Sequence, residues 1–143
     1  MFSNSSKYAL KAVLYLAVNS SESKKIMAKN ISEPINVPQA YIAKLLQELA
    51  KHNIVSSTRG PNGGFYLNED NRQISLIEII NVIDGENRLN SCLLSLQNCN
   101  SSKPCPLHKF AAPFRTDLIK NLENKSINDM VLEIKNKQSF LPL

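Results

Sequence analysis

The stretch Arg59-Gly60-Pro61-Asn62-Gly63-Gly64-Phe65-Tyr66-Leu67 decides the fold, because it holds three of the four glycines of the 143-residue chain. Short runs of β-branched, aromatic and small polar residues flank the turn, at 54–58 before it and at 65–67 after it. Asn62-Gly63 is a strong signal for a tight hairpin, because both residues tolerate a positive φ. The stretch therefore predicts a β-hairpin with an arginine at its mouth.

Three helices are predicted before this hairpin. Residues 5–18 are almost entirely apolar, so the first helix is expected to be buried nearly all round. A short helix over residues 24–31 is expected to end at Glu33-Pro34. The third helix is predicted to begin at Pro38, which suits a first turn because it lacks an N–H group, and to run to about Lys51. Its apolar side consists of Tyr41, Ile42, Leu45, Leu46, Leu49 and Ala50.

The other side of the third helix carries amide, lysine and small side chains, namely Gln39, Ala40, Ala43, Lys44 and Gln47. Glutamine can pair with adenine edges, Lys44 can reach guanine or phosphate, and small side chains allow close approach to a major groove. Two helices followed directly by a β-hairpin predict a winged helix-turn-helix, although an ordinary solvated helix face is the alternative. Arg59 at a glycine-rich tip fits insertion into a minor groove. The predicted DNA contacts are Pro38, Gln39, Ala40, Tyr41, Lys44, Arg59, Gly60 and Gly63.

The charge of the chain is divided unevenly. Residues 1–66 hold eight basic and three acidic residues, whereas residues 67–143 hold nine of each. All of the net charge of +5 therefore lies in the half that contains the hairpin, which fits either ordinary surface lysines or a half that binds a polyanion. The chain has no apolar run long enough to span a membrane and does not begin like a signal peptide, so we expect a cytoplasmic protein without a membrane partner.

Local signals also divide the rest of the chain. The residues 75–78 form a capping-box pattern, Gly85 should end the helix that follows it, and residues 126–129 form a similar box. Residues 108–124 are predicted to form a long helix with an apolar stripe, suited to contact with a second copy of the chain or to packing within one copy. We expect a DNA-binding domain at 1–85, a cysteine-bearing sensor loop at 86–107, and a dimerisation helix with a short helix at 108–143.

All three cysteines lie in the sensor loop, at Cys92, Cys99 and Cys105, and His108 follows them. An odd number of cysteines in a cytoplasmic chain argues against a disulfide framework. Three thiolates and one imidazole can bind zinc or an iron–sulfur cluster, and a thiol redox switch is the third interpretation. The spacing is looser than the usual knuckle of structural zinc sites, so a zinc site is the less favoured of the two metal sites.

From residue 5 to residue 134 the chain resembles the Rrf2 family of bacterial transcription regulators. The resemblance rests on residues 7–12, 31–33, 37–42 and 45–50, and most specifically on residues 54–67. It implies a mainly α fold, a winged helix-turn-helix with a small β-hairpin wing and a long C-terminal dimerisation helix. It also implies a homodimer that binds palindromic double-stranded DNA, and we expect it to act as a repressor.

The resemblance further implies that Cys92, Cys99 and Cys105 bind an iron–sulfur cluster whose state, set by iron, redox conditions or nitric oxide, controls DNA affinity. The ending Cys105-Pro106-Leu107-His108 is similar to that of the iron–sulfur-assembly regulators, in which the histidine completes the ligand set of a [2Fe–2S] cluster. A [4Fe–4S] cluster is the second form. Six residues, not five, separate the first two cysteines, and Ala43 replaces an acidic residue that contacts bases, which predicts a different operator. A thiol enzyme is the competing class, and the sequence contains no nucleophile–base arrangement beyond Cys105 and His108 that would support it.

Overall fold

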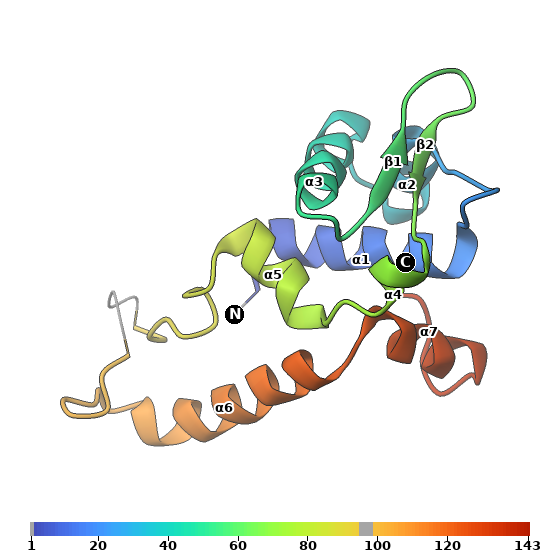
Figure 1. The fold of residues 1–143 in the computed structure, drawn as a ribbon. Helices are drawn as coiled ribbons and strands as arrows, with labels where there is room; N and C mark the ends of the chain where they lie inside the picture. Colours follow the sequence, from blue (N-terminus) through green and yellow to red (C-terminus); the bar gives the residue numbers. More distant parts are fainter. Residues whose placement is uncertain (1, 95–98) are drawn as a thin grey trace.

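The computed structural model describes residues 2–94 and 99–143, and residues 95–98 of the predicted sensor loop lie outside the described part. The described residues form a mainly α-helical fold with one two-stranded antiparallel sheet, as Figure 1 shows. The elements, in order, are α1 (Asn4–Asn19), α2 (Ala28–Ile35), α3 (Gln39–Lys51), β1 (Ser56–Thr58), β2 (Gly64–Tyr66), α4 (Glu69–Arg72), α5 (Leu76–Asp84), α6 (His108–Asn124) and α7 (Ile127–Lys135).

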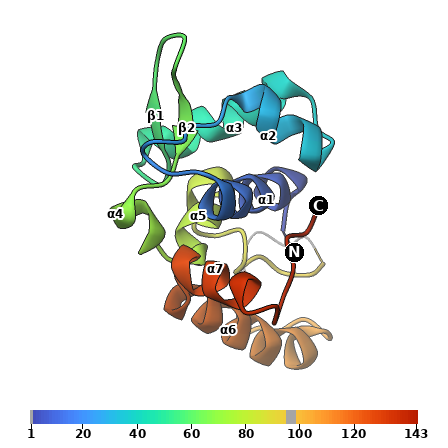
Figure 2. The same ribbon diagram turned by 90° about the vertical axis from the view of Figure 1, so that its right-hand side faces the viewer.

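Helix α1 lies at the centre of the fold and contacts α2, α3, α5 and α7 (Figure 2). Its apolar sequence explains this position, because only Asn4 and Lys7 of its sixteen residues are exposed. Leu16 of α1 belongs to one buried cluster with Ile42 of α3, Ile79 of α5 and Ile127 of α7. Six of its sixteen residues are buried and eight are half-buried, so the predicted burial of α1 is confirmed on one side of the helix and is partial on the other.

The prediction for the second helix is wrong at both ends. Residues 24–27 are extended, and Ile26 exchanges two backbone hydrogen bonds with Phe65, with N···O distances of 2.9 and 2.8 Å. Helix α2 begins only at Ala28, and it continues through Pro34 in its last turn. Proline removes one hydrogen bond there, which a helix end tolerates better than a helix middle. Asn36, in the left-handed conformation with φ of 59°, then ends α2.

The hairpin forms the wing, here defined as residues 56–66, with Ser56 opposite Tyr66 and Thr58 opposite Gly64. The turn differs from the predicted Asn62-Gly63 type, because neither of these residues has a positive φ. Instead, the N–H of Gly63 donates to the carbonyl of Gly60 at 3.0 Å, and the positive φ values fall at Gly60 (103°) and Gly64 (148°). Pro61 accounts for this difference, because its ring fixes φ near about −65° as the second residue of such a turn.

The two capping predictions have opposite outcomes. Ser126 accepts from the N–H of Asp129 at 3.1 Å, and the carboxylate of Asp129 accepts from the N–H of Ser126 at 2.9 Å, so this capping box is confirmed. The box predicted at Ser75 is wrong, because its side chain makes no cap hydrogen bond. The backbone on either side of Ser75 pairs with residues 125–127 instead, and this pairing holds the start of α5 against the start of α7.

Helix α6 begins at His108 and ends at Asn124, as predicted. None of its residues is buried, and the ribbon runs along the edge of the molecule beneath α5 (Figure 1). Phe110 and Phe114 are 69% and 60% exposed, so the apolar stripe of α6 is largely uncovered. Among the described residues, no helix is both long enough and apolar enough to cross a membrane. Gly85 ends α5, and the division into domains at 85 and 107 stays a prediction.

Candidate nucleic-acid interface and cysteine site

Helix α3 presents one buried side and one exposed side. Ile42, Leu46 and Leu49 are fully buried beneath it, and this anchoring fixes which side faces outward. The outward side contains Pro38 at the N-cap and the exposed Gln39, Ala40, Lys44 and Gln47. These side chains match the donors, acceptors and small groups that suit a major groove. No acidic residue lies in the first turn of α3 to neutralise the positive end of its helix dipole. The N-terminus of α3 can therefore attract a phosphate group.

Tyr41 occupies a different environment from the other predicted contacts of α3. It is half-buried, and its hydroxyl lies 2.6 Å from the hydroxyl of Ser5 on α1. Its ring packs edge-on against Tyr8, with centroids 5.9 Å apart and planes at 88°. The hydroxyl is thus engaged inside the protein, and the base contact predicted for Tyr41 stays a prediction.

The tip of the wing is polar and exposed, with Arg59, Gly60, Pro61 and Asn62 all facing solvent. The structure therefore places Arg59 and Gly60 where a groove could be reached, whereas Gly63 is half-buried in the turn. An open hollow of about 500 Å³ separates the wing from α3. Lys51 of α3 and Arg59 of the wing both line it, so each of the two elements contributes a cation to the hollow. Such an arrangement suits a strand of phosphates.

Lys25 and Lys51 were not among the residues predicted to contact DNA. The Nζ atom of Lys25 lies 5.5 Å from the ring centroid of Tyr66 on β2, because Ile26 pairs with the neighbouring Phe65. Lys51 lines the hollow between α3 and the wing. Both belong to the basic excess of residues 1–66, but only the long-range pairing of Ile26 could have placed Lys25 beside the wing.

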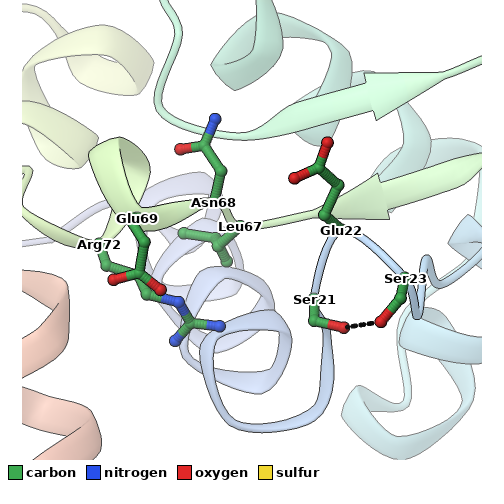
Figure 3. Close-up of a pocket in the computed structure, with 7 residues that line it drawn as sticks. All are labelled: Ser21, Glu22, Ser23, Leu67, Asn68, Glu69 and Arg72. Atoms are coloured by element: carbon green, nitrogen blue, oxygen red, sulfur yellow. Dashed lines mark hydrogen bonds between the residues drawn. The ribbon is translucent and has the colours of Figure 1, made fainter.

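An arginine of α4 binds the C-terminal end of α1. Arg72 of α4 donates to the carbonyls of Ala17 and Ser20 at 2.7 and 3.1 Å, and thereby satisfies carbonyls at the end of α1. Its guanidinium lies in a hollow of about 490 Å³ that Glu22 and Glu69 also line (Figure 3). Because the arginine is committed to backbone and two carboxylates are nearby, this hollow is not suited to an anion.

The predicted metal ligands come together as two pairs. The Sγ atoms of Cys92 and Cys105 lie 3.8 Å apart, and the Sγ atom of Cys99 lies 2.9 Å from Nδ1 of His108. The N–H of His108 donates to the carbonyl of Cys105 at 3.0 Å, so this turn places Cys105 and His108 next to each other at the start of α6. Within the described ranges, no three His, Cys, Asp or Glu side chains form one compact group. The structure thus shows paired ligands and not a single four-ligand cage.

The environment of the pairs differs. Cys92 is only 7% exposed and lies close in the chain to the buried Leu89, whereas Cys99, Cys105 and His108 are partly exposed. Three thiols and one imidazole are soft donors that suit iron–sulfur clusters or zinc. The chemistry of the donor set therefore fits the group implied by the resemblance.

Comparison with known proteins decides the family. A family model named Rrf2, described as an iron-dependent transcriptional regulator, matches residues 2–133. The chain belongs to the Rrf2 family. It is thus a DNA-binding transcriptional regulator and not an enzyme, and α2, α3 and the wing form its winged helix-turn-helix.

Individual relatives agree with this assignment to the Rrf2 family. A candidate helix-turn-helix transcriptional regulator of Aquifex aeolicus is 29% identical over 142 residues, which cover 98% of this chain and 96% of that protein. The helix-turn-helix transcriptional regulator IscR of Klebsiella pneumoniae is 30% identical over 135 residues, covering 94% of this chain and 79% of IscR.

Two solved structures share the fold of this Rrf2 chain. The structure of CymR, the global cysteine regulator of B. subtilis, superposes with a TM-score of 0.72 at 23% identity and covers 92% of this chain and 96% of CymR. IscR of T. potens superposes with a TM-score of 0.71 at 24% identity, covering 97% and 91%. At these identities the likeness shows the fold alone, and it confirms the predicted fold class.

Proposed function

We propose that this Rrf2 regulator binds a palindromic operator as a homodimer and that an iron–sulfur cluster controls its affinity for that operator. Cys92, Cys99, Cys105 and His108 are the ligands in this proposal. The main observation that supports the cluster is that these four residues form two close pairs, Cys92 with Cys105 and Cys99 with His108. The family description as an iron-dependent transcriptional regulator supports the same choice.

The spacing within the cysteine pair is the quantitative argument. Two thiolates that each lie about 2.3 Å from a tetrahedral metal ion are about 3.8 Å apart. The Sγ atoms of Cys92 and Cys105 are separated by 3.8 Å. This pair therefore already has the separation of two thiolates on one metal ion.

The second pair distinguishes between the two kinds of metal centre. Cys99 and His108 lie together, but they do not join Cys92 and Cys105 in one group of described residues. A single zinc ion requires all four ligands around one point. A [2Fe–2S] cluster takes two ligands on each of two irons, so two separate pairs favour the cluster.

The residues of the chain then have defined roles. Cys92 and Cys105 would hold one iron, and Cys99 and His108 the other. When bound, the cluster supplies an iron centre whose assembly and oxidation state change the charge and order of the segment that holds it. The exposed side of α3 contacts base edges in the major groove, Arg59 enters the minor groove, and Lys51 and Lys25 face phosphates.

The homodimer is proposed from the surface of α6. Phe110 and Phe114 are the most exposed side chains of its apolar stripe, and they lie four residues apart on the same side of the helix. A second copy of α6 would cover them. A pair of winged helices related by a two-fold axis would then contact two half-sites about one or more helical turns apart.

The test is anaerobic purification followed by measurement of iron, acid-labile sulfide and zinc per chain together with the visible absorption spectrum. The proposal expects iron, sulfide and a coloured protein. The two histidines provide a matched pair of variants, because His52 is exposed on the DNA-binding half and is far from the cysteines in the sequence. His108→Ala should change the spectrum and reduce iron content, whereas His52→Ala should change neither. Zinc without sulfide, or a colourless protein without metal, would refute the cluster.

A further inference from the structure

Asp84 is an acidic residue at the unfavourable end of its own helix. It is the last residue of α5, where the negative end of the helix dipole opposes a carboxylate. The carboxylate lies instead at the first turn of α1, where a negative charge is favoured. Oδ1 of Asp84 accepts from the hydroxyl of Ser3 at 2.5 Å, and Oδ2 accepts from the hydroxyl of Ser6 at 2.6 Å. The carboxylate of Asp84 therefore stabilises the start of α1, although the residue belongs to the end of α5.

Ser3, Ser5 and Ser6 form the start of α1 and are here called the serine turn. Ser3 is the N-cap, and its hydroxyl also accepts from the N–H of Ser6 at 3.0 Å. The Ser3 N–H additionally points to Oδ2 of Asp84 at 3.4 Å. Ser6 is fully buried, so its hydroxyl needs the partner that Asp84 provides. Asp84 therefore completes the cap of α1, although it lies 81 positions from Ser3 in the sequence.

The serine turn also contacts the helix that faces DNA. The hydroxyl of Ser5 lies 2.6 Å from that of Tyr41 in the first turn of α3. Tyr41 is further held by the edge-on contact of its ring with Tyr8, one α1 turn later. A movement of the serine turn would consequently shift the N-terminal end of α3, which is the end that approaches base edges.

In the chain, Asp84 leads directly into the segment that holds the first cysteine. Gly85 follows it with φ of 85° and ends α5, and Cys92 is the eighth residue after Asp84. Leu89 and Cys92 in this short segment are both buried. Asp84 is thus bonded to the serine turn on one side and covalently joined to the cysteine-bearing segment on the other.

We propose that Asp84 is a positioning residue for DNA recognition, which acts through the serine turn and Tyr41 to fix the N-terminal end of α3 according to the state of the cysteine segment. The inference rests on the proposed function in taking α3 as the helix that contacts bases. It does not require Asp84 to touch DNA or any metal ion.

Operator binding tests the proposal. The probe is a duplex recovered by the native full-length chain from a random DNA pool, and a scrambled duplex is the control. Asp84→Asn and Ser5→Ala should each weaken binding to the selected duplex at least about fivefold. The double variant should be no more than about twofold weaker than the poorer single variant, because both substitutions disturb one element. Asp84→Glu should restore most of the affinity. Glu22→Gln, which removes an exposed carboxylate, controls for the change of charge.

A second measurement needs no DNA. Hydrogen exchange of the full chain should quicken in residues 3–8 and 39–44 in Asp84→Asn, and recover in Asp84→Glu. If the native chain selects no duplex, the proposed function fails, and the exchange result alone decides the role of Asp84. Unchanged binding in the two single variants, losses that multiply in the double variant, or quickened exchange confined to residues 76–90 would each overturn the proposal.

Discussion

Substitution of Gly64 by alanine should damage the protein far more than the same change at Gly60. Both residues belong to the wing and both have a positive φ, of 148° and 103°. A Cβ atom at Gly60 would meet nothing within 4 Å, whereas one at Gly64 would lie 2.8 Å from the carbonyl carbon and oxygen of Ile26. The two substitutions therefore share backbone strain, but only the Gly64 variant has a backbone overlap.

The magnitudes follow from these contacts. An unfavourable φ costs about 1–3 kcal/mol, and this is the whole expected effect at Gly60. At Gly64 the overlap is with backbone atoms, which cannot rotate away, so the pairing of Ile26 with Phe65 must open. Two hydrogen bonds of roughly 1 kcal/mol each would then be lost. Gly64→Ala should thus be about 2 kcal/mol less stable than Gly60→Ala.

Urea and thermal unfolding followed by circular dichroism would measure this difference. For a chain of this size, 2 kcal/mol corresponds to roughly 5–8 °C in Tm. The Gly64 variant should also lose operator affinity, because Lys25 and the wing are held together by the same pairing. Equal stability of the two alanine variants would refute the close approach of the wing to Ile26.

Three further predictions concern the dimer, the acid stability and the wing. Phe114→Glu should shift the protein towards monomer in analytical ultracentrifugation, whereas Phe140→Glu, at an 80% exposed tail position, should not. Burial disfavours ionisation of Asp84, but hydrogen bonds from Ser3 and Ser6 and the charge of Arg88 together lower its pKa below the ordinary 3.8. Because the pKa of Asp84 is lower in the folded chain than in the unfolded chain, its carboxylate stabilises the fold at pH values above the unfolded-state pKa. The stability advantage of the native chain over Asp84→Asn in urea unfolding should therefore be present near pH 6 and shrink below about pH 4. Arg59→Ala should weaken operator binding about tenfold and reduce the slope of log K against log salt by about one per protomer, whereas Lys135→Ala should change neither in a titration from low to high salt.

Features of the fold that depend on local chemistry could be predicted from the sequence. Pro38 marks the start of α3, and Asn53 adopts a left-handed conformation with φ of 59° just after the end of α3. Gly85 ends α5. The capping box at Ser126 is likewise set by residues three positions apart. Each signal lies within one turn of the backbone that it controls, so neighbouring residues contain the information.

Features that depend on tertiary contacts could not be predicted. Residues 24–27 have a helical composition, but pairing with Phe65 makes them extended. Ser75 has the sequence of a cap, but the pairing of its neighbours with residues 125–127 replaces the predicted box. The contact of Asp84 with Ser3 joins residues 81 positions apart. No local pattern specifies such partners.

For the candidate site, the sequence could predict the ligand types but not their arrangement. Spacing identified Cys92, Cys99, Cys105 and His108 as a set, while the division into two pairs came only from the structure. The exposed side of α3 was predictable from its periodicity. The engagement of the Tyr41 hydroxyl with Ser5 was not, because it depends on how α1 crosses α3.

The most direct test of the central claim compares operator affinity in two states of the same protein. The dissociation constant for the selected duplex should be measured anaerobically with the cluster-loaded chain and with the chain after chelation of iron, at one salt concentration. We predict at least about a tenfold difference between the two states, as expected for a coupling of roughly 1–3 kcal/mol. Cys99→Ser should behave like the iron-free chain under both conditions. Equal affinities for the loaded and iron-free chains would contradict control of DNA binding by the cysteine site.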